Sequence, residues 1–338
     1  MRQILTTRNG GVEVLKIIET PKATPRSGEA LISVKASGLN FADIMARQGL
    51  YPDAPKKPCV LGYEVSGLVE EVGEGVDRAL LGKSVLAPTM FGGQSEMVSV
   101  PVNQVFEKPK ALSFEEAAAI PVNYLTAYGL LVVMGSLRKE ESVLVHNAGG
   151  GVGLAALDIA KHIGAKTFGT ASESKHAFLK ERGLDHAIDY RMQDWLPALM
   201  KLTHGSGVEL VIDPIGGTNW KKSYQALRAT GRMGVFGLSI VAGNRIRGIL
   251  TFIKSSLQSP KFQPMRLLNS NKGIFGFNLA HLLQERKKIR DWMSAILSGV
   301  EEGWVHPYVG KTFRFSEISQ AHIYIETRSN IGKVVLIP

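Results

Sequence analysis

The chain has 338 residues, of which 44% are hydrophobic and 21% are charged. This length predicts two domains, and the composition excludes disordered, collagen-like and disulfide-rich chains. The single cysteine, Cys59, excludes internal disulfides and cysteine-cluster zinc modules, and it favours a reducing compartment. No apolar run approaches the roughly 18 residues of a membrane span, and the first residues lack the apolar centre of a signal peptide. We therefore expect a soluble cytoplasmic protein.

The net charge of +10 is concentrated in one part of the chain. No acidic residue occurs between Asp213 and Glu285, whereas residues 214–284 carry ten lysines and arginines, as many as the whole surplus. Such a segment suits an anionic cofactor, an acidic lipid surface or nucleic acid. A solvated surface with a chance bias is the alternative. Nucleic acid is the weakest of these interpretations, since aromatic residues are sparse and no nucleic-acid motif is present.

The first 115 residues contain short apolar runs separated by glycine and proline, a pattern typical of an all-β barrel. The pattern changes at Ser113, which is followed three residues later by Glu116 and so predicts a capped helix start. The predicted strands of the barrel are Ala30–Val34, Ser66–Val72, Lys83–Ala87 and Glu96–Val100.

Strands and helices then alternate, which predicts a parallel α/β sheet. The end of the chain reads as a helix, Arg286–Gly303, and a closing strand, Gly332–Pro338. The strands predicted for the sheet are Ser142–His146, Lys166–Thr170, Ala187–Asp189, Glu209–Asp213 and Arg232–Phe236, and the helices are Val152–Gly164, Ser174–Arg182 and Trp220–Leu227.

A glycine-rich loop joins the first of these strands to its helix, in the segment Asn147–Gly153. In this order Gly150 lets the backbone approach a pyrophosphate, and Gly153 allows close packing of helix on strand. The helix N-terminus, with Gly151 and Val152, then presents free N–H groups to the phosphates. Because the loop lies within a βαβ unit of the right length, it predicts a dinucleotide site, although Ala148 replaces the first glycine of the usual pattern.

The end of the next strand distinguishes the two nicotinamide cofactors. An NAD site has a carboxylate there for the ribose, whereas an NADP site supplies hydroxyls or a cation for the 2′-phosphate. Ala171 stands at the discriminating position, followed by Ser172 and Lys175. Glu173 is the competing signal, because it lies 20 residues after Gly153. The sequence favours NADPH, with Ser172 and Lys175 as ligands.

Four segments together resemble one enzyme family: Gly38–Pro52, Leu61–Gly67, the glycine loop and the closing Gly332–Leu336. The chain resembles the zinc-independent quinone oxidoreductases of the medium-chain dehydrogenase/reductase family over essentially its whole length. It is most similar to their branch of synaptic vesicle membrane protein homologues. The resemblance implies an α/β fold, with a GroES-like β-barrel catalytic domain, a Rossmann doubly wound parallel sheet and a homodimer. The expected limits are 1–118 for the catalytic domain, 119–284 for the NADP-binding domain with a basic insert at 243–272, and 285–338 for a return to the catalytic domain.

The resemblance also indicates which positions would have to bind a catalytic zinc ion. The zinc enzymes of the family have a cysteine where this chain has Asn40 and a histidine where it has Tyr63. Catalytic zinc needs about three Cys, His or carboxylate ligands, and neither replacement is a competent one. We therefore expect no zinc. Without a Lewis acid, an acceptor that polarises its own carbon is needed, such as a quinone or an α,β-unsaturated carbonyl, with hydride supplied by the cofactor.

By resemblance, Asn40 and Thr126 lie beside the nicotinamide and Tyr51 lines the substrate cleft. Asp43 is expected to hold the Asn40 loop, with a catalytic base as the alternative. Relatives often carry a tyrosine where this chain has Met45, which leaves the proton donor unassigned. Further cofactor contacts implied by the resemblance are Tyr190, Phe236, Gly237, Leu238, Asn330 and Lys333.

The basic insert contains apolar residues at helical spacing, with cations on the other faces. Residues 243–268 therefore predict a basic amphipathic helix that is a lid, a dimer contact or a membrane-binding segment. We expect an NADPH-dependent reductase of quinones or enones. The alternative is a non-catalytic NADPH-binding protein that associates with membranes or protein partners. The predicted apolar stripe consists of Ile246, Ile249, Leu250, Ile253 and Leu257.

Overall fold

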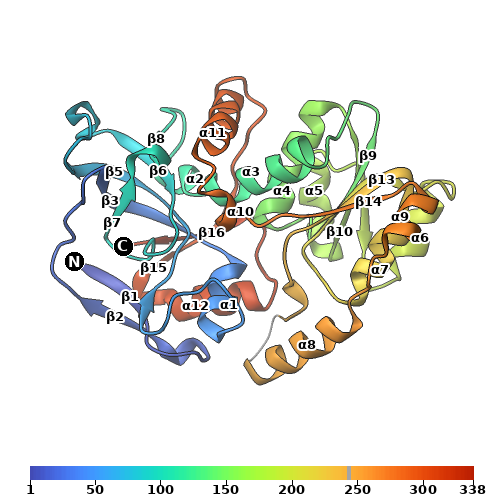
Figure 1. Cartoon of the computed structure of the whole chain (residues 1–338), viewed down its shortest axis with the longest axis horizontal. Helices are drawn as coiled ribbons and strands as arrows, with labels where there is room; N and C mark the ends of the chain where they lie inside the picture. The colour runs from blue at the N-terminus through green and yellow to red at the C-terminus, as the bar shows by residue number, and fades with distance from the viewer. Residues whose placement is uncertain (242–244) are drawn as a thin grey trace.

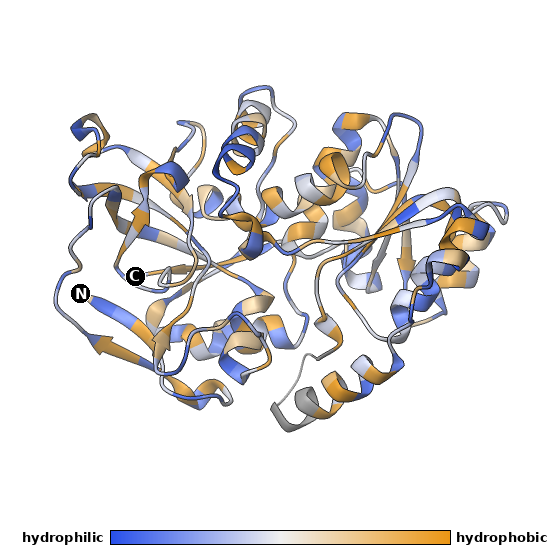
Figure 2. Ribbon diagram, viewed as in Figure 1, coloured by the Kyte–Doolittle hydropathy of each residue, from blue (hydrophilic) through white to orange (hydrophobic). Residues whose placement is uncertain are grey.

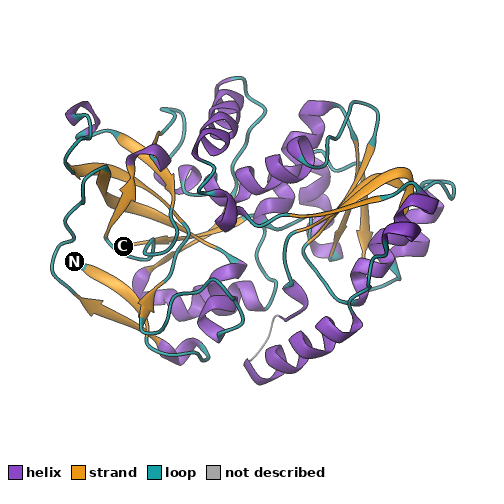
Figure 3. Cartoon of the chain, in the orientation of Figure 1, coloured by secondary structure: helices purple, strands orange, loops and turns teal. Residues whose placement is uncertain are grey.

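The computed structural model describes residues 1–241 and 245–338, which form two lobes built on separate sheets (Figures 1 and 3). The sheet of the first lobe has the order β15-β16-β3-β5-β6-β8, with β7 also paired to β3. Its two C-terminal strands close it, because Val334 on β16 pairs with Leu39 on β3. The bounds are β3 (Glu29–Leu39), β5 (Glu64–Val72), β6 (Ser84–Pro88), β7 (Met97–Pro101), β8 (Phe106–Glu107), β15 (Val309–Arg314) and β16 (Lys333–Ile337).

A smaller sheet of order β2-β1-β4 completes this lobe, with two helices beside it. The sequence did not predict these elements. Ile4 and Leu15 from this sheet pack with Ile318 and Ile325 in one apolar cluster. The elements are β1 (Arg2–Thr6), β2 (Leu15–Glu19), β4 (Cys59–Val60), α1 (Phe41–Gln48) and α12 (Ile318–Glu326).

The second lobe contains a six-stranded parallel sheet of order β11-β10-β9-β12-β13-β14. This is the Rossmann order, in which the order of the strands reverses between β9 and β12 and leaves a ligand crevice at their carboxyl ends. The strands are β9 (Ser142–His146), β10 (Lys166–Ala171), β11 (His186–Asp189), β12 (Val208–Asp213), β13 (Leu227–Val235) and β14 (Gly273–Gly276). The expected fold class, a GroES-like domain with a Rossmann sheet, is confirmed.

Helices cover both faces of this sheet (Figure 1). α3 (Pro121–Tyr128), α4 (Gly151–Ile163) and α11 (Arg286–Glu301) contribute to the largest apolar cluster, which also includes Leu86 and Phe106 of the first lobe. α6 (Trp195–Leu202) and α7 (Thr218–Gln225) pack on the other face. The predicted helix Trp220–Leu227 is wrong at its end, because the buried Leu227 begins β13 and pairs with Val208.

One helical stretch, Phe114–Val133, is long and apolar enough to cross a membrane, contrary to the expectation from the sequence. It comprises α2 (Phe114–Ala117), α3 and the π-helical turn Gly129–Val133. Within its most apolar window 72% of the stretch is buried inside the protein, which is the property of a core helix. The predicted cap is confirmed: Ser113 accepts from the N–H of Glu116, whose carboxylate accepts from the N–H of Ser113.

The basic insert lies between β13 and β14 and contains α8 (Arg245–Gln258) and α9 (Pro264–Ser270). Gly243 and Asn244 of the predicted segment lie outside the described residues. α8 is the predicted helix, and on it Leu250, Ile253 and Leu257 are 64%, 52% and 82% exposed while Ser255 is buried. The apolar stripe therefore does not pack against this chain at these three positions. The side chains of Ile246 and Ile249, also part of the predicted stripe, lie outside what the structure describes. Figure 2 shows apolar residues along α8 at the periphery of the protein.

Candidate active site

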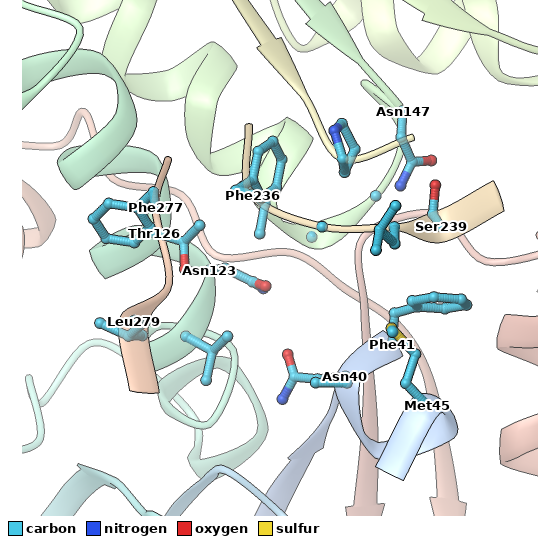
Figure 4. Close-up of a pocket in the computed structure, with 18 of the residues that line it drawn as sticks. Asn40, Phe41, Met45, Asn123, Thr126, Asn147, Phe236, Ser239, Phe277 and Leu279 are labelled. Atoms are coloured by element: carbon cyan, nitrogen blue, oxygen red, sulfur yellow. The ribbon is translucent and has the colours of Figure 1, made fainter. Parts of the chain in front are cut away.

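A cavity of about 1280 Å³ opens between the two lobes (Figure 4). Its walls come from α1, α3, the loop before α4, the segment after β13 and α10 (Leu279–Leu282). Three predicted site residues, Asp43, Ser172 and Lys175, are not among its lining residues. The predicted residues that do line it are Asn40, Tyr51, Thr126, Gly150, Gly151, Val152, Gly153, Tyr190, Phe236, Gly237, Leu238, Asn330 and Lys333.

The glycine loop forms the back of this cavity. β9 ends at His146, and α4 begins at Gly151 with Gly150 as its extended N-cap. The first N–H groups of a helix lack partners within it, so they are available to a phosphate. Gly153 packs tightly below, since a Cβ built there would lie 2.5 Å from the carbonyl oxygens of Asn147 and Ala148.

Beyond the loop, cations gather at the end of β10. The Nζ of Lys175 donates to the carbonyl oxygens of Arg328 at 3.0 Å and of Asn330 at 2.6 Å. Burial, followed by the neighbouring charges of Arg191 and Arg328, lowers the pKa of Lys175 to about 8. Ser172 is buried beside it, whereas Glu173 is exposed, and none of these three residues lines the cavity. Lysine, two arginines and a serine hydroxyl are the groups that suit a phosphate.

A buried ion pair lies under the middle of the cavity. Lys333 and Glu64 are 3% and 0% exposed and form a salt bridge. The Nζ of Lys333 also donates to Oδ1 of Asn40 at 2.6 Å, and Nδ2 of Asn40 donates to Glu64 at 3.0 Å and to the carbonyl oxygen of Gly38 at 3.3 Å. The Asn40 carboxamide is therefore held in one orientation by the pair.

Asp43 holds the start of α1 from below. Its carboxylate accepts from the N–H groups of Asn40 at 2.8 Å and Gly62 at 2.9 Å, and from Nε2 of Gln94 at 3.2 Å. Complete burial raises the pKa of Asp43 to about 7, against the opposing effect of these donors and of Lys333. Since Asp43 is enclosed and does not line the cavity, its contacts are those of a residue that fixes the Asn40 loop. The geometry gives no support to a catalytic base at this position.

The end of the cavity opposite the cations is apolar and aromatic. The rings of Tyr51 and Tyr63 meet edge-on, with centroids 5.9 Å apart. Burial raises the pKa of both tyrosines above its ordinary value. The Tyr63 hydroxyl is buried and has no hydrogen-bond partner among the residues that the structure describes. Other apolar side chains that line the cavity are Phe41, Met45, Leu50, Val122, Phe277, Leu279, Leu282 and Leu283.

Several lining residues were not predicted from the sequence. Asn123 precedes Thr126 by three positions on α3, so the helical period was a usable signal for it. His146 ends β9 at the sheet edge where ligands bind, and that position was a second signal. Arg328 gave no local signal, because it reaches the end of β10 only through the fold.

The chain was compared with known proteins. The family model described as alcohol dehydrogenase GroES-like domain matches residues 26–110, and the one described as zinc-binding dehydrogenase matches residues 151–295. The synaptic vesicle membrane protein VAT-1 homolog of Danio rerio is 37% identical over 337 residues, which cover 99% of this chain and 69% of that protein. The quinone oxidoreductase of Homo sapiens is 30% identical over 343 residues, covering 100% of this chain and 98% of that protein.

A solved structure shares the fold over the full length. The crystal structure of Escherichia coli quinone oxidoreductase complexed with NADPH has a TM-score of 0.88 and 30% sequence identity to this chain. The match covers 100% of both chains. The order of the domains, the sheet topology and these similarities agree. The chain therefore belongs to the medium-chain dehydrogenase/reductase family of oxidoreductases, with the VAT-1 homologues and the quinone oxidoreductases among its relatives.

Proposed function

We propose that the protein is an NADPH-dependent reductase that transfers hydride to a quinone or an α,β-unsaturated carbonyl without zinc. The observation that carries the proposal is one cavity that is lined by a phosphate-binding loop and by apolar side chains, with Arg328 in its wall and Lys175 close to Arg328. The complex of the Escherichia coli relative with NADPH supports the choice of cofactor. A soluble, cytoplasmic homodimer is part of the same proposal.

Each part of the cavity has a role in this proposal. The N–H groups of Gly151, Val152 and Gly153 bind the pyrophosphate, and Lys175 with Ser172 binds the 2′-phosphate. NADPH, when bound, supplies the hydride. Thr126 and the segment Phe236–Leu238 position the nicotinamide half, while the apolar end excludes water and orients the acceptor.

Reduction of an enone or quinone consumes one proton together with the hydride. Tyr51 is proposed either to donate this proton or to hold the quinone or enone in place, because it lines the apolar end of the cavity. Burial raises the pKa of its phenol, which keeps the hydroxyl protonated at neutral pH and able to hydrogen-bond the acceptor oxygen, but also makes it a weaker acid.

The donor atoms do not suit the zinc that the name of the matching family model implies. The Asn40 oxygen already accepts from Lys333, and Tyr63 would have to lose a proton that burial holds in place. Among the described residues, no three His, Cys, Asp or Glu side chains converge. We therefore propose an acceptor that needs no Lewis acid, and no step of the reaction is assigned to a metal.

The first test is the oxidation of NADPH and NADH in the presence of a panel of ortho-quinones, para-quinones and enones. The oxidation is measured as the loss of reduced-nicotinamide absorbance. We expect turnover with at least one acceptor class and a preference for NADPH. In the Lys175→Ala variant, loss of a charge-assisted contact of about 1.5–3 kcal/mol lowers NADPH affinity about 10- to 150-fold and leaves NADH affinity nearly unchanged.

The pH dependence gives a second measure of the same residue. Since the pKa of Lys175 is about 8, the side chain is charged at pH 7 and neutral at pH 9. The preference of the wild-type protein for NADPH over NADH is therefore expected to fall across this range, and that of Lys175→Ala to stay flat. A preference for NADH in the wild type would refute the NADP assignment and return the role to Glu173.

A second function is favoured by the exposed apolar side chains of α8. We propose that an outer apolar face, formed by Leu250, Ile253 and Leu257, makes peripheral contact with an anionic membrane. All three side chains are more than half exposed, and Lys254 on the same helix is exposed as well. Apolar area with neighbouring cations is the combination that binds acidic lipid surfaces. In the non-catalytic alternative, this face and NADPH binding are the whole function.

Sedimentation with vesicles tests this face. Wild-type protein is expected to bind phosphatidylglycerol vesicles at low salt and to bind phosphatidylcholine vesicles weakly. Leu250→Ser combined with Leu257→Ser removes about 3 kcal/mol or more of apolar transfer, so binding falls at least tenfold. Met192→Ser is the matched control, because Met192 is 79% exposed on another part of the surface. The face would instead be assigned to contacts between copies of the chain if the wild type did not bind vesicles but self-associated, and if the double variant lost that self-association.

A further inference from the structure

Asn123 is a polar residue of the cavity that the proposed reaction leaves unused. This side chain is 95% buried, since only 5% of its surface is exposed, and it points into the cavity from α3 (Figure 4). Its Nδ2 donates to the carbonyl oxygen of Ala119 at 3.0 Å, which fixes the orientation of the carboxamide. Its Oδ1 has no hydrogen-bond partner among the residues that the structure describes. Because Asn123 lines the cavity, this oxygen is available to a ligand bound there.

The carboxamide of Asn40, in contrast, already uses most of its hydrogen-bonding groups within the protein. Both of its N–H groups are used, on Glu64 and on Gly38, and its oxygen accepts from Lys333. It retains only one lone pair for a ligand, whereas Asn123 retains both lone pairs and one N–H. Of the two carboxamides, Asn123 has the greater capacity to bind a ligand in the cavity.

The position of Asn123 defines which part of a ligand it meets. On one side it contacts the start of α4, since a Cβ built on Gly151 would lie 2.5 Å from its Nδ2. On the other side Thr126 follows it by one helical turn on the same face of α3, and both line the cavity. Asn123 thus lies between the seat of the pyrophosphate and the seat of the nicotinamide ring.

We propose that Oδ1 of Asn123 accepts a hydrogen bond from the nicotinamide riboside half of the cofactor and positions that half for hydride transfer. The inference rests on the proposed function, because it presupposes that the cavity binds NADPH. The donor is a hydroxyl of the ribose or the amide N–H of the nicotinamide, the two donor groups available in that half. Asn123 is in this sense a positioning residue of the site.

Binding measurements with the intact protein test the proposal. Asn123→Leu removes the acceptor at similar volume, and Asn123→Ser keeps a hydroxyl for the Ala119 carbonyl but does not reach the cavity centre. Both variants are expected to bind NADPH about tenfold more weakly, as measured by the change in nicotinamide fluorescence, because one hydrogen bond in a water-poor site is lost. Both are expected to bind 2′,5′-ADP, which lacks the nicotinamide half, like the wild type.

The outcomes separate this proposal from the proposed function. If the wild type binds neither NADPH nor 2′,5′-ADP, the proposed function fails. If the wild type binds both and Asn123→Ser binds NADPH with unchanged affinity, the role of Asn123 is overturned. Equal losses for NADPH and 2′,5′-ADP would also overturn it, since they would reveal a structural role. The acetylpyridine analogue of NADP⁺, which lacks the amide N–H, identifies the donor. If that N–H is the partner of Asn123, the variants bind the analogue with the same affinity as the wild type does. If a ribose hydroxyl is the partner, the variants bind the analogue more weakly than the wild type does.

Discussion

Replacing Lys333 by methionine is expected to lower the free energy of unfolding by about 3–5 kcal/mol. The substitution leaves the carboxylate of Glu64, which is 0% exposed, without its cationic partner. The N–H of Val122, which donates to Glu64 at 2.7 Å, does not replace a full charge. The measurement is denaturant unfolding, monitored by both tryptophan fluorescence and circular dichroism. A single free energy of unfolding is defined only if the two probes give coincident curves.

The matched control is the double variant Lys333→Met with Glu64→Gln. It removes both charges, so its unfolding free energy is expected to recover most of the loss. If the double variant were as unstable as the single one, the cause would be lost packing of the lysine stem and not an unpaired charge. Because Lys333 also holds the Asn40 carboxamide, NADPH affinity in the double variant reports that second role separately.

The parts of the site that depend on local chain order could be predicted from the sequence. The strand Ser142–His146, the glycine loop and the following helix are adjacent in the chain, and their order alone indicates a phosphate site. The helix cap at Ser113 was predictable for the same reason, since its two partners are three residues apart. The residues at the end of β10 were predicted as cofactor ligands because the Rossmann connection places that strand beside β9, and the two strands do pair.

The partners that depend on the fold could not be predicted in this way. Arg328 approaches Lys175 only because the chain returns to the first lobe after the Rossmann sheet. The pairing of Lys333 with Glu64 requires the registers of β16 with β3 and of β3 with β5, which no local pattern specifies. The resemblance implied that Lys333 is near the cofactor, but not that it is half of a buried ion pair.

The basic insert shows the limit of periodicity. Apolar residues at helical spacing predict a helix with an apolar face, and α8 is that helix. Periodicity does not indicate whether that face meets the protein or the solvent. Here Ser255 faces inward, because the approach to Gly217 leaves little room: a Cβ on Gly217 would lie 2.8 Å from the Ser255 hydroxyl oxygen. The larger side chains Leu250 and Leu257 therefore face outward.

Gly153→Ala is expected to abolish measurable NADPH binding at micromolar protein and to lower the unfolding free energy. Alanine is a better helix former than glycine by about 1 kcal/mol, so propensity alone predicts a stabilising change. Sterics oppose it, because the new Cβ would lie 2.5 Å from two carbonyl oxygens, those of Asn147 and Ala148. Overpacking against atoms that cannot rotate away costs about 1–3 kcal/mol, and the relief is a shift of the loop that binds the pyrophosphate.

Gly273→Ala is the control for this substitution. Its new Cβ meets only Cβ of Arg232 at 3.5 Å, an ordinary contact, so NADPH binding and unfolding free energy are expected to be nearly unchanged. The measurements are titration of nicotinamide fluorescence and denaturant unfolding for both variants. Since the clash at Gly153 is with backbone, no rotamer change of a neighbour can absorb it, and the loop must move. Undiminished NADPH affinity in Gly153→Ala would show that the pyrophosphate does not bind at the start of α4, and the cofactor assignment would fall with it.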